Sequence, residues 1–151
     1  MNKGKAVFAT LMMLAVFVPT VLLLDSALSP LAASNQVSSR GAIKAIGVGV
    51  YSDSACTTKL TSIDWGVLDP GQSRNATAYL RNEGNSAMLL TQSTANWTPS
   101  NASNYITLRW DYRGSSLAAG SVVKVTFTLV VSSGISGITD FSFDIIVVGT
   151  G

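Results

Sequence analysis

Apolar and polar residues alternate with a period of two along most of the chain after residue 34. In residues 122–131, Val123, Val125 and Phe127 share one face, and residues 141–147 repeat the pattern. Successive side chains of a β-strand point to opposite faces, so this alternation predicts half-buried strands and no helix. Shorter runs of the same kind cover residues 43–51, 63–67, 75–81, 88–91 and 106–112.

Turn-forming residues separate these runs. Asp69-Pro70-Gly71 favours a β-turn, and Asn82-Glu83-Gly84-Asn85 is interpreted as a hairpin loop between two strands. Just before the first turn, Ile63, Trp65 and Val67 share the predicted inward face. About seven short strands at this spacing predict an all-β fold, an antiparallel β-sandwich of immunoglobulin-like or jelly-roll type.

An apolar run from Ala6 to Leu24 precedes the strands. As a helix it would nearly cross a bilayer core, and Lys3 and Lys5 before it favour export of the residues on its C-terminal side. The sequence therefore predicts an N-terminal apolar helix within a signal or anchor segment of residues 1–33, with residues 6–24 able to contact a membrane. The rest of the chain is expected outside the cell or on its surface.

Three interpretations of this segment stay open. A cleaved signal peptide would be cut near Leu31-Ala32-Ala33, where the residues are small, although most such apolar cores are shorter. An uncleaved segment would be a membrane anchor. The third interpretation is that the segment resembles archaeal type IV pilins, whose leaders end in Lys-Gly before an apolar helix. Lys3-Gly4 fits that pattern, whereas Lys5, Asp25 and Pro30 depart from it.

Composition excludes several function classes. Of 151 residues, 47% are hydrophobic and 12% charged; histidine is absent, and Cys56 is the one cysteine. The commonest general base is therefore missing, and neither an intrachain disulfide nor a cysteine-rich zinc site can form. A net charge of +2 gives no electrostatic case for nucleic acid. We expect no enzyme, metal or cofactor, and interpret Cys56 as a partly buried thiol or an intermolecular bridge.

Three N-glycosylation sequons begin at Asn75, Asn96 and Asn101. Asn75 lies on a predicted outward face and the other two in a polar loop, so all three are candidate sites for N-linked glycans. Trp97 and Tyr105 flank the same loop. Aromatic residues there suit either stacking on a sugar or, more simply, a rim that seals the sandwich.

Two stretches carry a resemblance to a wider group of proteins. Residues 62–71, together with residues 79–85, are similar to immunoglobulin-like surface domains, with a Pro-Gly turn and an Asn-x-Gly-Asn loop. Residues 96–101 and 108–112 resemble exported archaeal surface proteins, including subunits of pilus-like filaments. The resemblance covers residues 43–149 and implies a surface location, since such domains serve as spacers, adhesins and filament subunits.

Residues 34–46 are polar at first and then β-prone, and they precede a sandwich domain expected over residues 47–151. They are interpreted as a linker or as a donor strand that pairs with the open sheet edge of a neighbouring copy. Val37, Ile43 and Ile46 are the apolar residues expected at that subunit interface. The favoured function is a structural subunit of an extracellular pilus-like filament, a homopolymer assembled by strand donation or by a pilin-like helix. The alternative is a membrane-anchored surface domain for adhesion or partner binding.

Overall fold

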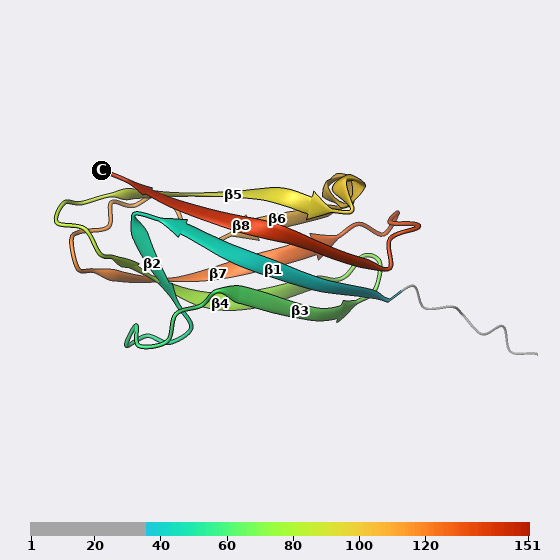
Figure 1. Cartoon of the computed structure of the whole chain (residues 1–151), viewed down its shortest axis with the longest axis horizontal. Coiled ribbons are helices and arrows are strands. Elements are labelled where there is room, and N and C mark those ends of the chain that lie inside the picture. The colour runs from blue at the N-terminus through green and yellow to red at the C-terminus, as the bar shows by residue number, and fades with distance from the viewer. Residues whose placement is uncertain (1–35) are drawn as a thin grey trace, which may run out of the picture. The chain divides into compact units, whose positions relative to one another are not determined.

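The computed structural model of the chain describes residues 36–151, which form an all-β sandwich of two four-stranded sheets (Figure 1). The predictions for residues 1–33, namely the apolar helix, its cleavage and its membrane contact, lie outside the described residues. Within the described residues, no helix has the length and apolar character needed to span a membrane.

Each of the two sheets combines strands from the first and the second half of the described sequence. Sheet A has the order β3-β1-β8-β5 and sheet B the order β2-β4-β7-β6. The strands are β1 (Val37–Ile46), β2 (Val48–Tyr51), β3 (Ser62–Leu68), β4 (Ser73–Asn82), β5 (Leu89–Thr98), β6 (Ile106–Trp110), β7 (Val122–Val131) and β8 (Asp140–Thr150). A short 3₁₀ helix, Ser100–Asn104, links β5 to β6.

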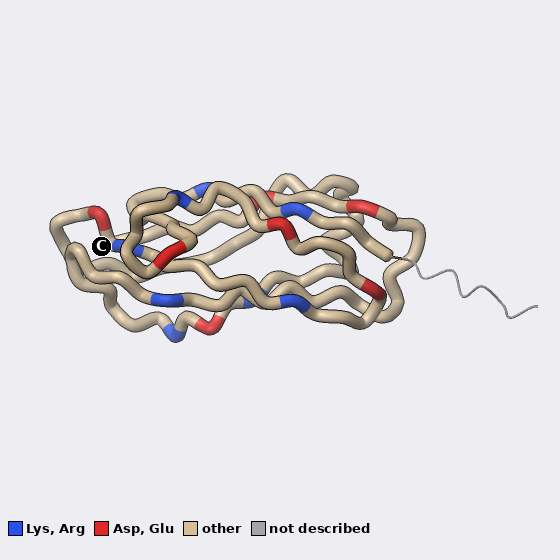
Figure 2. Tube along the Cα trace, turned by 90° about the horizontal axis from the view of Figure 1, so that it is seen from below, with Lys and Arg blue, Asp and Glu red and all other residues tan. Residues whose placement is uncertain are grey.

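The core lies between the sheets and consists of the residues that the alternation places on inward faces. Val125, Phe127 and Leu129 of β7 are fully buried, as are the odd-numbered apolar residues of β8. The predicted β-sandwich is therefore confirmed. Basic and acidic residues are interspersed over its backbone trace (Figure 2).

The prediction of a wholly antiparallel sandwich is wrong, because sheet A is mixed. β1 runs antiparallel to β3 but parallel to β8. The single strand predicted over residues 43–51 is also wrong. Gly47 has a φ of 73° and separates β1 in sheet A from β2 in sheet B, which brings the total to eight strands. A left-handed backbone of this kind favours glycine, since it has no Cβ to clash.

A β-bulge corrects the predicted inward face of β3. The pairing with β1 shifts at Trp65, and Gly66 adopts a φ of 67°. One extra residue in a strand reverses the faces of the residues after it. Val67 is consequently exposed, and Leu68 takes its place in the core. Arg74 Nη1 donates a hydrogen bond to the carbonyl of Trp65 at 2.8 Å. This bond gives a partner to a backbone carbonyl at the bulge, where the pairing with β1 is interrupted.

The predicted hairpin at residues 82–85 is a connection between the two sheets, because β4 lies in sheet B and β5 in sheet A. Asn82 is fully buried and holds this connection. Its Nδ2 donates to the carbonyls of Ser86 and Leu117, both at 2.8 Å, and its Oδ1 accepts from the Gly84 amide. Every polar atom of the Asn82 side chain thus has a partner, as burial requires.

Candidate strand slot of sheet A

β1 occupies a slot in the middle of sheet A, between β3 and β8 (Figure 1). The walls of the slot are large apolar side chains of those two strands, all buried: Trp65, Leu68, Phe141, Phe143 and Ile145. The strand that fills it is the first strand described and continues into the rest of the domain through Gly47 alone. β1 is thus a central strand with a single, short covalent connection to the sandwich.

The three residues predicted at a subunit interface lie at graded depths along β1. Val37 is fully buried, Ile43 is half-buried and packs against the core, and Ile46 is 61% exposed. Between them, the inward positions carry Ser39 and Gly41. Here β1 therefore fills the slot with one fully buried large side chain and two small residues, while β3 and β8 supply most of the apolar surface.

Gly41 is matched closely to the walls of the slot. A Cβ built at this position would lie 3.0 Å from Ile145 Cδ1 and 3.2 Å from Trp65 Nε1. Both separations are shorter than the 3.5–4.0 Å at which carbon atoms pack best. Both neighbouring side chains are themselves buried in the core. The slot therefore favours the smallest residue at this point of β1.

Two polar atoms in the slot have no hydrogen-bond partner among the described residues: Ser39 Oγ and Trp65 Nε1. A buried donor or acceptor left unpaired costs about 1–3 kcal/mol. The contact of β1 with the bulged part of β3 is therefore less favourable than the apolar packing deeper in the core. Backbone ladders to β3 and β8 hold β1 on both sides.

On the outer face of sheet A, an ion pair joins β1 to β8. Lys44 Nζ lies 2.6 Å from Asp144 Oδ2, and Asn96 Nδ2 also donates to this carboxylate. The hydrogen bond from Lys44, and to a smaller extent that from Asn96, lowers the pKa of Asp144 from its usual value. The charged form is thus the one that this contact stabilises.

A groove opens where β1 loses its pairing with β3. That pairing ends at Ala42, and the Ile43 amide then donates to the carbonyl of Thr61. The groove has a volume of about 560 Å³, and Ile43, Val48 and Leu60 are among its apolar lining residues.

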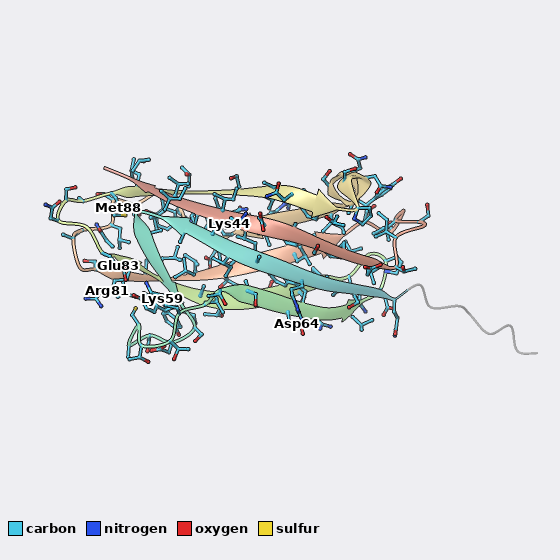
Figure 3. The ribbon with its side chains drawn as sticks, viewed as in Figure 1. Lys44, Lys59, Asp64, Arg81, Glu83 and Met88 are labelled. Carbon is cyan, nitrogen blue, oxygen red and sulfur yellow. The ribbon has the colours of Figure 1, made fainter. Side chains whose placement is uncertain are left out.

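Charged residues lie along one side of this groove. Lys59 Nζ is 3.1 Å from Glu83 Oε1 (Figure 3). Lys59 Nζ is also 4.4 Å from the centre of the Tyr51 ring, and the Tyr51 hydroxyl donates to the same carboxylate. The hydrogen bonds from Tyr51 and Lys59 lower the pKa of Glu83. The contacts of Lys59 with Tyr51 and with Glu83 raise the pKa of Lys59. Lys59 and Glu83, which both line the groove, therefore form an ion pair along one side of it.

The three sequon asparagines are all exposed. Asn75 uses its Oδ1 to accept from Thr128 at 2.8 Å, which leaves its nitrogen free of that bond, and Asn101 makes no side-chain hydrogen bond within the described part of the chain. The nitrogen of Asn96 instead donates to Asp144, from a bulge in β5 where Asn96 has a φ of 52°. Because glycans are attached through this nitrogen, Asn101 and Asn75 present it more freely than Asn96 does.

The remaining candidate residues, Cys56 and Trp97, lie in a turn and at the edge of the core. Cys56 is half-buried in the β2–β3 loop, where Asp53 accepts hydrogen bonds from the amides of Thr57 and Thr58. Trp97 stacks on Phe143 with ring centres 4.2 Å apart and packs against the core. Trp97 thus covers the edge of the core, as expected of an aromatic rim.

Sequence reasoning missed the roles of Gly41, Gly47 and Lys44. A glycine in the middle of a β-prone run was the available signal for the first two, since such glycines mark close approaches or bends. The register that places Lys44 beside Asp144 is set by pairing between distant parts of the chain, which no local pattern reports.

Within residues 36–151, no group of three or more histidine, cysteine, aspartate or glutamate side chains is placed to hold a metal ion. No protein-family model matches the chain, and no curated protein matches its sequence.

Proposed function

We propose that the chain is a structural subunit of an extracellular, pilus-like filament, in which β1 of one copy fills the slot of the next. The observation that carries the proposal is the position of β1: a central strand attached through the single residue Gly47. Every contact that β1 makes in its own sandwich is offered equally by the slot of a second copy. Exchange of an identical element is a low-cost route to assembly, and a head-to-tail exchange propagates when its symmetry does not close.

The proposal places the chain among exported immunoglobulin-like or jelly-roll surface proteins and assigns it no catalytic role. Its partners are other copies of itself, and its exposed sequons suit N-linked glycans on an extracellular surface. Assembly through a pilin-like N-terminal helix is the other route to a filament, and it depends on residues outside the described range.

One observation favours the alternative, a membrane-anchored surface domain for adhesion or partner binding. β1 pairs with β3 and β8 of its own chain, so the sandwich is complete in a single copy. The experiment must therefore decide whose β1 occupies the slot.

An engineered disulfide between β1 and β3 can show whether the β1 in a slot belongs to the same chain or to a second copy. Ala42 and Ser62 face each other on exposed positions of the antiparallel ladder, next to the hydrogen bond between the Ile43 amide and Thr61. They therefore form a non-hydrogen-bonded pair, with Cα atoms about 4.5 Å apart, within the range of disulfides. The variant is Ala42→Cys with Ser62→Cys in the full-length exported chain, with Cys56→Ser to remove the native thiol.

We expect oxidised assemblies of this variant to give a ladder of covalent multimers on a non-reducing gel, because each disulfide joins two chains. The matched control is Thr77→Cys with Thr126→Cys, a facing pair of β4 and β7 that stays within one sandwich and should give monomers only. Covalent dimers alone would indicate a closed reciprocal exchange and refute the filament. Monomers alone for the β1 pair would refute strand exchange and favour the anchored domain.

A further inference from the structure

Strand exchange alone gives no net driving force for assembly, because β1 makes the same contacts in its own slot and in a neighbour's. An additional surface must be covered only in the assembled state. The one-residue connection at Gly47 restricts where that surface lies. Adjacent Cα atoms are about 3.8 Å apart, so Val48 of the donor lies within about 8 Å of its Ile46. The body of the donor must therefore sit beside the point where β1 leaves the acceptor's slot.

Exposed apolar side chains gather at that point. Ile46 is 61% exposed at the end of β1, and Leu89 is 50% exposed at the start of β5. Ile46 pairs with Val148 of β8, and Leu89 pairs with the neighbouring Thr150. Ile146 and Val148 lie on the same outer face of sheet A, half-buried between them. In Figure 1, the end of β1, the start of β5 and the C-terminus lie at one end of the sandwich.

We propose that Leu89, Ile146 and Val148 of the acceptor form, together with Ile46 of the donated β1, an end patch that is the docking surface for the body of the donor copy. The inference rests on the proposed strand exchange and identifies the second interface that makes exchange favourable. An exposed apolar group of this kind on a sheet face is typical of an interaction site. Its occupant is a second copy of this chain, since only the donor's body is tied to Ile46 by a single residue.

The test is the concentration at which the purified full-length chain begins to polymerise, measured by light scattering. We expect Leu89→Ser to raise this concentration roughly five- to tenfold, because the exposed half of a leucine is no longer buried on assembly. Ile46→Thr should act in the same direction. The control is Val67→Ser, since Val67 is 46% exposed but lies on β3, opposite Ser38 near the start of β1.

Val67→Ser should leave the threshold unchanged, and the denaturation midpoint of the Leu89→Ser monomer should match that of the parent. An unchanged threshold for both end-patch variants, with interchain disulfides still forming between positions 42 and 62, would refute the docking surface and leave strand exchange intact. Equal shifts for Val67→Ser and Leu89→Ser would also refute it. Intrachain disulfides alone in the parent would overturn strand exchange itself, and the docking surface with it.

Discussion

The close fit at Gly41 predicts that adding a single methyl group to β1 destabilises the sandwich. Gly41→Ala in an ordinary strand conformation should stabilise a protein by about 0.4–1 kcal/mol, because it restricts the unfolded chain. Here the new Cβ would meet Ile145 Cδ1 at 3.0 Å and Trp65 Nε1 at 3.2 Å. Overpacking of a buried site costs about 1–3 kcal/mol. The balance is a net loss of about 1 kcal/mol, and Gly41→Val should lose about 3 kcal/mol or more.

The assay is equilibrium unfolding in urea, with the midpoint and slope measured for each variant. Gly134→Ala is the matched control, because Gly134 is exposed and a Cβ there would meet only Ser132 Oγ at 3.7 Å. This control should be neutral or slightly more stable than the parent. A Gly41→Ala variant that behaves like the control would show that the slot has room at this position, and the reasoning on its close fit would fail.

A second substitution tests the assigned cause. Trp65→Phe removes the indole nitrogen that a Cβ at position 41 would approach, together with a buried donor that has no partner among the described residues. The cost of Gly41→Ala should therefore be smaller in the Trp65→Phe background, with a coupling energy of about 0.5 kcal/mol or more. Additive costs in this cycle would exclude Trp65 as the wall that β1 contacts here.

Three further predictions concern the ends and faces of the domain. The pKa of Asp144 is lowered in the folded chain, so its contact with Lys44 stabilises the fold above the usual pKa of 3.8 and is lost as the pH falls through the lowered value; in acid titrations, Lys44→Met should lose less stability than the parent. Asn101→Gln should reduce the mass of the native protein by one N-linked glycan, measured by mass spectrometry. The mature N-terminus should lie near Ser34 for a cleaved signal, at Lys5 for a pilin-like leader, or at the first residue for an anchor.

The alternation of apolar residues was sufficient to predict the strands and most of their buried faces. In β7 and β8 the pattern identified every fully buried side chain correctly, because a half-buried strand must alternate. It failed at β3, where the bulge at Trp65 and Gly66 exposes Val67. A bulge adds one residue without changing the local composition, so the sequence pattern alone does not reveal it.

The assignment of strands to sheets could not be predicted, since it depends on contacts between distant residues. Residues 43–51 form one continuous β-prone run, yet Gly47 divides them between the two sheets. The parallel pairing of β1 with β8 joins the two ends of the described chain, and neither strand carries a local signal for it. The candidate slot was consequently visible in the sequence only as a β-prone N-terminal segment.

The composition of β1 is compatible with both a stable sandwich and the proposed exchange of this strand between copies. Most of the buried apolar surface around the slot belongs to β3 and β8, so the core depends little on which copy supplies β1. Backbone hydrogen bonds on both sides hold any strand of suitable length, whereas Gly41 restricts the register in which it fits. A larger apolar residue at this position would demand a wider slot and a different core. Under the proposed exchange, the backbone ladders would hold the incoming β1 and the close approach at Gly41 would set its register.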